Sequence, residues 1–295
     1  MLWHAGSADE EAIYLAALRE GLASLGYKER ENITLEHRFP NETPERFISQ
    51  AVELVSLKVD LLVTVTQLAA LAAKRATGTI PVVAVLVTDP IGGGLAESFA
   101  RPGGNITGLT NPSVDLSGKR LALLKEAMPA ARRLAILLNA SPPQIAMKTF
   151  DEYQAAGALL GVQVIPSEVR STDDLEAAFN RMRGQVDGII QGPGGVLYQA
   201  RAMLAKLAVE NRVPLMANTR EAVDAGALMS YASDFRSTFH RSAHYVDKIL
   251  KGERPADIPI EQPTKFELLI NLKTARAIGL TIAETFLLRA DGIVE

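Results

Sequence analysis

The residues best suited to bind a ligand stand where two apolar segments end. The segment LVTV leads into Thr66 and Gln67, and the segment PVVAVLV leads into Thr88 and Asp89. If both segments are strands of one parallel sheet, their hydroxyl, amide and carboxylate groups share its carboxyl edge, where α/β proteins bind ligands. A helix that begins there adds free N–H groups and a partial positive charge, which favour a carboxylate. The alternative is that these residues only cap the helices that follow.

The second of these junctions continues through Pro90 and the glycines at 92–94. We expect a helix to begin after these glycines, which would place Thr88 and Asp89 at its amino terminus and at the mouth of a binding site. The alternative is an ordinary capped tight turn.

Two later turns also follow apolar segments. Gln191 precedes Gly192-Pro193-Gly194-Gly195, which lacks the Gly-Lys-Ser/Thr of a phosphate-binding loop, so close approach of the backbone to a ligand is the better interpretation. Asp234 lies after another apolar segment. It is suited either to pair with a ligand ammonium or to cap the next helix.

The chain shows no catalytic or metal-binding motif. It has four histidines and no cysteine, and it contains neither an HExxH nor a GxSxG pattern. His240 and His244 share one helix face, but a solvated face is favoured over a zinc pair because no acidic residue stands at the usual intervening position. We therefore expect no catalytic residue, metal or cofactor.

Composition limits the class of protein. The 295 residues are 47% hydrophobic and 22% charged, with a formal net charge of −3, as in a globular chain that buries one large core or two moderate ones. The net charge gives no basic footprint for nucleic acid. The longest apolar stretch, Leu61–Ala73, is too short and too polar to span a membrane.

Short β-rich segments alternate with segments of helical period, which predicts an α/β fold with mostly parallel sheets flanked by helices. Helices are expected after Thr43-Pro44 and Ser141-Pro142, where a cap hydroxyl precedes a proline. The expected strands are Leu61–Val65, Ile80–Val87, Leu134–Leu138, Val162–Ile165, Val186–Gln191, Val213–Met216 and Ala227–Tyr231.

The alternation is interrupted in two places. The stretch Arg101–Pro112 (RPGGNITGLTNP) concentrates Pro, Gly and Asn before a new helix at Ser113–Met128, and Glu253–Lys265 carries three prolines. We interpret both as irregular crossings between two lobes.

Three stretches resemble the substrate-binding proteins of ABC transporters, tryptophan/tyrosine type, with the type I periplasmic-binding fold. They are LREGLASLGYKERENITLEHRF, VDLLVTVTQLAALAAKRATGTIPVVAVLVTDPIGGGLAESFARPGGNITGLT and ILKGERPADIPIEQPTKFELLINLKTARAIGLTI, and the resemblance covers essentially the whole chain. It implies two Rossmann-like lobes joined by three crossings, with a ligand cleft between them. The lobes would be residues 1–111 with 235–258, and residues 112–234 with 259–295.

The resemblance also implies which residues contact the ligand. Thr66, Gln67, Thr88 and Asp89 would hold a ligand carboxylate, and Asn139 would face them from the second lobe. The remaining expected contacts are Gly6, Ser7, Gly194, Asn218 and, for an ammonium, Asp234. The chain departs from its relatives at 191–195, where they carry a Thr-Asp-Asn type of turn, and this puts amino-acid specificity in doubt. Trp3, Tyr198 and Phe235 are candidate aromatic clamps, with core packing as the alternative.

The implied function is capture of a small molecule, an amino acid or related carboxylate and notably an aromatic one, by lobe closure without chemical turnover, and delivery to a membrane permease. The resemblance implies a monomer that binds no nucleic acid. It also implies a periplasmic or extracytoplasmic location, with a leader removed ahead of Leu2. The alternatives are an effector-binding or sensory domain of the same fold, or an enzyme on two Rossmann-like lobes.

Overall fold

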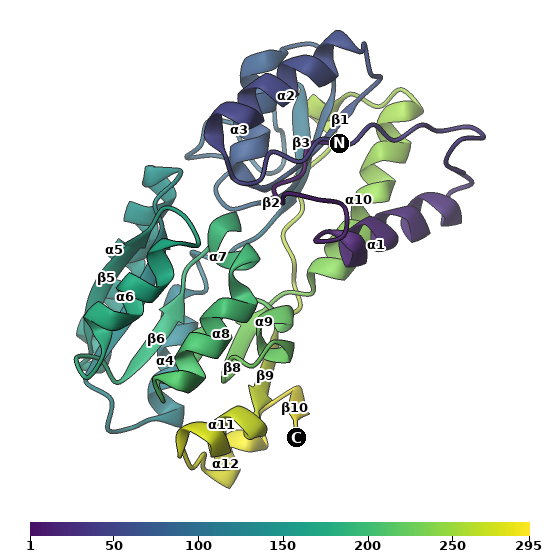
Figure 1. Ribbon diagram of the computed structural model, residues 1–295. Coiled ribbons are helices and arrows are strands. Elements are labelled where there is room, and N and C mark those ends of the chain that lie inside the picture. Colours follow the sequence, from purple (N-terminus) through teal and green to yellow (C-terminus); the bar gives the residue numbers. More distant parts are fainter. The chain divides into compact units, whose positions relative to one another are not determined.

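The computed structural model describes residues 1–295, which form two compact units (Figure 1). Unit 1 is Met1–Pro112 with Phe235–Thr264, and unit 2 is Ser113–Asp234 with Lys265–Glu295. The chain therefore crosses from one unit to the other after Pro112, after Asp234 and after Thr264.

The third crossing lies six residues beyond the boundary that we expected at 258. The Ile260 amide donates to the Phe99 carbonyl at 2.7 Å, and the Glu261 amide donates to the Gly108 carbonyl at 3.0 Å. These backbone bonds keep the segment after residue 258 with unit 1.

Unit 1 contains a three-stranded parallel sheet in the order β1-β2-β3, formed by Leu62–Val65, Val82–Val87 and Ile106–Thr110. Strand β3 lies inside the stretch 101–112 that we expected to be irregular, and that expectation was wrong. All five residues of β3 are buried, and it pairs with β2 in register Val83↔Thr107. Gly108 permits this pairing, because a Cβ built there would lie 1.9 Å from the Ala84 carbonyl oxygen.

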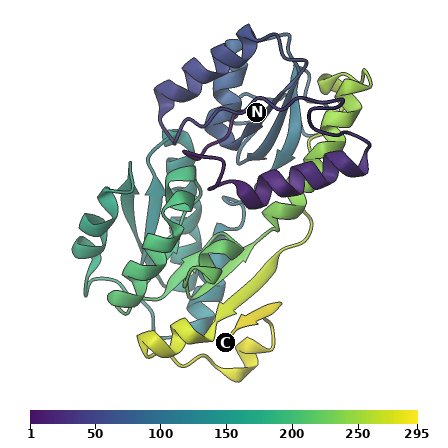
Figure 2. The same cartoon turned by 45° about the vertical axis from the view of Figure 1, so that its right-hand side comes forward.

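Helices cover both faces of this sheet. Helices α2 and α3 contact each other over a cluster that includes Phe47, Leu54 and Leu62, while α1 and α10 pack side by side on the other face (Figures 1 and 2). The helices are α1 (Ala12–Ser24), α2 (Pro44–Ser56), α3 (Thr66–Ala76), α10 (Phe235–Leu250) and the short η1 (Pro255–Asp257).

The amino-terminal residues add to this sheet only through isolated bridges. Leu2 bridges in parallel to Thr64 on one side and to Arg38 on the other. Leu2, ahead of α1, and Arg38, between α1 and α2, therefore pair through single bridges and form no strand.

Unit 2 contains a seven-stranded sheet in the order β10-β9-β8-β7-β6-β4-β5. All neighbouring strands are parallel except β8 and β9, and the sequence patterns did not predict β9 or β10. The strands are β4 (Arg133–Asn139), β5 (Gln163–Val169), β6 (Gly188–Gln191), β7 (Leu215–Ala217), β8 (Met229–Ala232), β9 (Glu267–Asn271) and β10 (Gly292–Val294).

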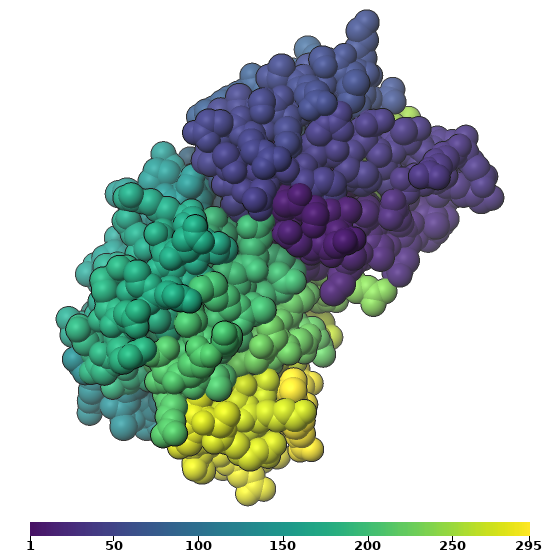
Figure 3. Space-filling view, in the orientation of Figure 1, coloured from purple at the N-terminus to yellow at the C-terminus, as the bar shows by residue number.

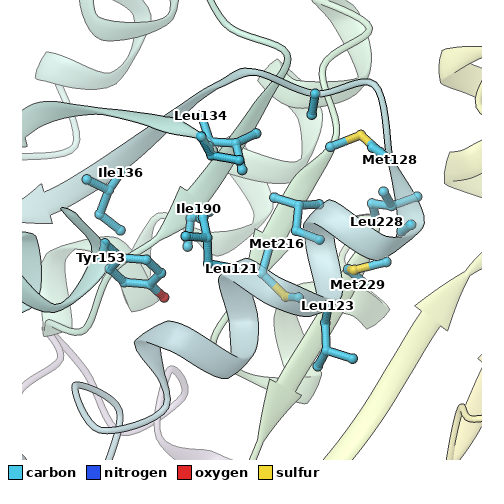
Figure 4. Close-up of a cluster of buried hydrophobic side chains, with 14 of the residues drawn as sticks. Leu121, Leu123, Met128, Leu134, Ile136, Tyr153, Ile190, Met216, Leu228 and Met229 are labelled. Atoms are coloured by element: carbon cyan, nitrogen blue, oxygen red, sulfur yellow. The ribbon is translucent and has the colours of Figure 1, made fainter. Parts of the chain in front are cut away.

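Two apolar clusters cover the faces of the second sheet, and alternate residues of β4 point to opposite sides. Leu134 and Ile136 pack with Tyr153 and Met216 in one cluster (Figure 4), whereas Leu137 packs in the other cluster with residues of α6 to α9. The C-terminal residues, yellow in Figure 3, form one end of unit 2. The helices are α4 (Ser117–Ala127), α5 (Pro143–Leu160), α6 (Asp174–Met182), α7 (Gly195–Gln199), α8 (Arg201–Glu210), α9 (Arg220–Asp224), α11 (Leu272–Ile278) and α12 (Glu284–Leu287).

Two helices start where a hydroxyl-proline pair predicts them, but neither hydroxyl caps its helix. Thr43 is the N-cap residue of α2, yet its hydroxyl donates to the Asn41 carbonyl at 3.1 Å. Pro142 occupies the N-cap position of α5, one residue later than expected for Ser141. The proline therefore predicts where a helix begins better than the preceding hydroxyl does.

Candidate functional site

The first two expected site pairs lie at neighbouring strand ends of unit 1. Thr66 and Gln67 open α3 directly after β1, and Thr88 and Asp89 follow β2. Because β1 and β2 are parallel neighbours, these four residues share the carboxyl edge of the sheet.

The Gln67 side chain joins the two strand ends. Its amide nitrogen donates to the Asp89 carbonyl at 3.0 Å, and its amide oxygen accepts from the Asp89 backbone N–H at 3.1 Å. Gln67 is 5% exposed. Both functions of its amide are thus used inside the protein, so Gln67 shapes the edge of the sheet and presents no free amide group.

Thr66 has a strained backbone at the start of α3. Its φ of 79° is unusual for a β-branched residue, and such strain costs about 1–3 kcal/mol and clusters at functional sites. Its Oγ1 is buried without a hydrogen-bond partner. The hydroxyl is therefore available beside the first N–H groups of an 11-residue helix.

No helix follows the glycines after Asp89, and the sequence expectation was wrong on this point. The Asp89 carboxylate accepts from the Gly92 N–H at 2.9 Å, and Gly94 has a φ of 66°, so the chain folds into successive turns. A Cβ at Gly93 would lie 2.1 Å from the Gln67 amide nitrogen. Asp89 therefore caps a tight turn, and Thr88 lies at a strand end without a helix dipole.

Gly6 and Ser7 form an exposed turn after the Leu2 bridge. The Gly6 N–H and the Ser7 hydroxyl donate to the two carboxylate oxygens of Glu10, at 3.2 and 3.3 Å. The turn is held by its own acidic side chain.

Below that turn lies a buried charged cluster that the sequence patterns did not reveal. His4 Nε2 lies 3.0 Å from Glu11 Oε1, and His4 Nδ1 lies 3.4 Å from Glu42 Oε1. Burial lowers the pKa of His4, but the two carboxylates outweigh this and raise it above its ordinary value. Glu11 also accepts from the Ala5 N–H at 3.3 Å, so the cluster positions the chain that enters the Gly6 turn.

Three buried amide side chains lie at the carboxyl edge of the second sheet. Asn139 ends β4, Gln191 ends β6 and Asn218 follows β7, and each of them is at most 6% exposed. Their nitrogens donate to backbone carbonyls: Asn139 to Ser141, Gln191 to Leu197 at 3.1 Å, and Asn218 to Gly192 at 2.9 Å.

The oxygen of each of these amides has no hydrogen-bond partner. A buried acceptor without a donor is destabilising by about 1–3 kcal/mol, so the three oxygens make this sheet edge a candidate site for the donor groups of a ligand. Asn139 and Asn218 were expected from the sequence and Gln191 was not. Its position at a strand end, before a glycine-rich turn, was the available signal.

Gly194 allows the turn after β6 to approach Asn139. Its φ is 134°, and a Cβ there would lie 2.3 Å from Asn139 Cβ. The turn leads into α7, which has only five residues. The GPGG segment thus brings the backbone close to Asn139 and adds no polar side chain of its own.

Asp234, the last residue of unit 2 before the second crossing, is exposed and directly precedes α10. It follows β8, whose carboxyl end lies at the same edge as the ends of β4, β6 and β7 because these strands are parallel. Asp234 is the acidic residue nearest along the chain to that strand end.

Two of the candidate clamp rings belong to the core of unit 1. Trp3 is fully buried and stacks on Phe239 with a centroid distance of 5.7 Å, and Phe235 lies against Tyr14 at 6.4 Å. Tyr198 is partly exposed, with the Arg201 guanidinium 4.5 Å from its ring centroid. Core packing therefore accounts for Trp3 and Phe235.

No group of three or more His, Cys, Asp or Glu side chains is arranged to hold a metal ion. No helix combines the length and the apolar composition needed to cross a membrane.

Comparison with known structures defines the class of protein. A conserved domain protein from Vibrio cholerae superposes with a TM-score of 0.92 at 25% identity, covering 99% of this chain and 98% of that one. An ABC domain in complex with L-Trp from Streptococcus pneumonia superposes with a TM-score of 0.89 at 24% identity, covering 99% of both chains. The fold is that of the type I periplasmic binding proteins.

The family follows from the sequence comparison. The profile of the family "ABC transporter substrate binding protein" matches residues 9–294, and the chain belongs to this family. A curated relative, the tyrosine-binding protein of Clostridioides difficile (strain R20291), is 26% identical over 264 residues, which cover 88% of this chain and 75% of the relative.

Proposed function

We propose that this protein captures an amino acid or a closely related carboxylate, with aromatic amino acids as the first candidates. The observation that carries the proposal is the set of three buried amide oxygens without partners at Asn139, Gln191 and Asn218. Such acceptors suit the N–H donors of an ammonium group. The free Thr66 hydroxyl and the first N–H groups of α3 suit a carboxylate.

The names of two relatives support an aromatic ligand. The Clostridioides difficile relative is a tyrosine-binding protein, and the Streptococcus structure contains L-Trp. In our proposal the ligand carboxylate binds the edge of unit 1, and its amino group binds the edge of unit 2. A ligand that contacts both units favours the arrangement in which both contacts are made.

The same proposal extends to partners and location. We propose that the protein works as a monomer outside the cytoplasm, passes its ligand to an ABC permease in the membrane, and binds no nucleic acid. It releases its ligand unchanged and catalyses no reaction. Recovery of a chemically altered ligand after incubation, detected by mass spectrometry, would favour an enzyme.

The direct test is a thermal-shift screen of the twenty amino acids, with L-tyrosine and L-tryptophan first, followed by calorimetry of each hit. A ligand at 100 times its Kd adds about 2.7 kcal/mol to the free energy of unfolding, which a melting curve resolves. The proposal fails if no amino acid or aromatic acid raises the melting temperature.

Variants then locate the contacts. Thr66→Val, Thr88→Val and Asn139→Ala each remove one proposed contact and should weaken binding about 5- to 150-fold, since a ligand group left without its partner costs about 1–3 kcal/mol. Thr79→Val is the matched control, because Thr79 is exposed and precedes β2, at the opposite edge of the unit 1 sheet from Thr66 and Thr88. Unchanged affinity in all three variants would remove these residues from the site.

A further inference from the structure

Arg120 is a buried cation whose contacts all lie within unit 2. It belongs to the first turn of α4 and is 1% exposed. Its Nη1 donates to the Ser113 carbonyl at 2.7 Å and to the Ser113 hydroxyl at 2.9 Å, and its Nε donates to the Tyr231 carbonyl at 2.8 Å. It forms no ion pair with a carboxylate.

These two partners stand at the ends of the connecting segments. Ser113 is the first residue of unit 2 after the first crossing, and Tyr231 lies three residues before Asp234, where the second crossing begins. Arg120 therefore joins two parts of the chain that are far apart in sequence and that both lead into unit 1.

The third connecting segment reaches the same place through the sheet. It enters unit 2 at Lys265, and β9 then pairs with β8 in register Tyr231↔Leu268. The Phe266 ring also lies against the Tyr231 ring, with a centroid distance of 5.9 Å. The unit 2 ends of all three segments thus meet at Arg120 and Tyr231: Arg120 binds Ser113 and the Tyr231 carbonyl, and β9 pairs with Tyr231.

Burying a charged residue at this position is energetically unfavourable. Burial lowers the pKa of Arg120, and burying a cation without a carboxylate costs several kcal/mol. The Tyr153 hydroxyl lies beside it and offsets only part of this cost. What arginine alone supplies is a rigid planar fork that donates in two directions at once, to Ser113 and to Tyr231.

We propose that Arg120 is a positioning residue for ligand capture. It makes the unit 2 ends of the three connecting segments move as one body, so that rearrangement is confined to the few residues around 112, 234 and 264. The inference rests on the proposed function only in that capture needs such a rearrangement. A lysine at this position keeps the charge but cannot donate to both carbonyls with the same geometry.

The test measures the spread of arrangements in the protein without ligand. The native chain has no cysteine, so Glu45→Cys on α2 and Gln154→Cys on α5 provide two exposed labelling positions, one in each unit. Time-resolved energy transfer between the dyes gives a distribution of distances. We expect Arg120→Lys to broaden this distribution, and hydrogen exchange at residues 111–114 and 231–234 to become about tenfold faster, equal to 1.4 kcal/mol.

A matched control separates positioning from stability. Phe179→Leu weakens the core of unit 2 on α6 without touching Arg120 or its partners, and it should leave the distance distribution unchanged. If Arg120→Lys folds and gives the wild-type distribution, or if Phe179→Leu broadens it equally, the proposal is overturned.

A milder variant keeps the proposal testable if Arg120→Lys does not fold. Ser113→Ala removes one of the three hydrogen bonds of Arg120 and should broaden the distribution less than Arg120→Lys. If Arg120→Lys does not fold, an unchanged distribution in Ser113→Ala overturns the proposal. None of these measurements needs a ligand, so failure of every amino acid in calorimetry would refute the proposed function and leave this test intact.

Discussion

The carboxyl edges of the two sheets use polar side chains in different ways. In unit 1 the Gln67 amide and the Asp89 carboxylate form hydrogen bonds with neighbouring backbone groups, and the Thr66 hydroxyl has no hydrogen-bond partner. In unit 2 the nitrogens of three amides donate to backbone carbonyls, and their oxygens have no hydrogen-bond partner. The first edge thus offers backbone N–H groups and a hydroxyl, whereas the second offers acceptors.

This difference suits a ligand with an anionic end and a donor end. It also shows that a polar residue at a strand end can serve the protein instead of a ligand, as Gln67 does. Variants at these edges, and at two histidines of unit 1, should separate residues that support the fold from residues that keep a group free.

The largest effect is expected at the turn of unit 2. Gly194→Ala introduces a Cβ 2.3 Å from Asn139 Cβ at a φ of 134°, so the turn must move. Urea denaturation should show a loss of about 2–4 kcal/mol, and ligand affinity should fall as Asn139 shifts. In Gly161→Ala, where φ is also positive but no atom lies within 4 Å, the loss should be about 1 kcal/mol. Equal losses in both variants would show that contact with Asn139 is unimportant.

A smaller loss of stability is expected when the hydrogen bonds between the strand ends of unit 1 are removed. Gln67→Met keeps the size of the side chain but leaves the Asp89 N–H and carbonyl without their partner. The free energy of unfolding should drop by about 2 kcal/mol. Gln154→Met, at an exposed position on α5, should change it by less than about 0.5 kcal/mol. A Gln67 variant as stable as the wild type would mean that the amide is free for a ligand after all.

The stability of the protein should depend on pH through His4, the buried histidine below the Gly6 turn. The pKa of His4 is raised in the folded protein, so its contribution is fully present below the unfolded value near 6.5 and is lost as pH rises through the folded value. The stability advantage of the wild type over His4→Gln should therefore shrink from pH 6 towards pH 9, as measured by urea denaturation.

The pH dependence of stability expected from His37 has the opposite sign. Burial lowers the pKa of His37, whose Nδ1 accepts from Trp3 Nε1 at 3.0 Å. The advantage of the wild type over His37→Gln should grow as pH rises towards 7. Parallel curves for the two variants would contradict at least one of the two assignments.

The smallest effect is a gain in stability. Thr66→Gly relieves a positive φ that costs about 1–3 kcal/mol and introduces a glycine entropy cost of about 0.5–1 kcal/mol, for a net gain near 1 kcal/mol. Ligand affinity should fall in the same variant, because the hydroxyl is lost. Thr66→Ala keeps the strain and should lose affinity without gaining stability. A Thr66→Gly variant that binds as well as the wild type would show that the strain serves no ligand contact.

The strand-rich segments were predictable because buried parallel strands are continuous apolar runs. Patterns of this kind predicted β1, β2 and β4 to within about two residues at each end. Strand β3 was missed because its sequence, ITGLT, is flanked by Pro, Gly and Asn and contains a glycine. Only the approach of the Ala84 carbonyl explains that glycine.

The candidate site was predictable as a set of positions and not as a set of contacts. Strand ends identify Thr66, Asn139 and Asn218, because parallel strands align their carboxyl ends whatever the details of packing. Whether an amide at such an end is free depends on the loop it meets. Gln67 meets Asp89 across 22 residues of sequence, and no local pattern records that distance.

The sequence by itself determined the alternation of strands and helices, the polar residues at strand ends and the absence of cysteine chemistry, because these depend on residue type and local period. Tertiary structure alone decided which polar atoms stay free, since hydrogen bonds between distant segments consume some and leave others. It also decided the position of Arg120, whose partners Ser113 and Tyr231 come together only when β8 and α4 pack into one unit.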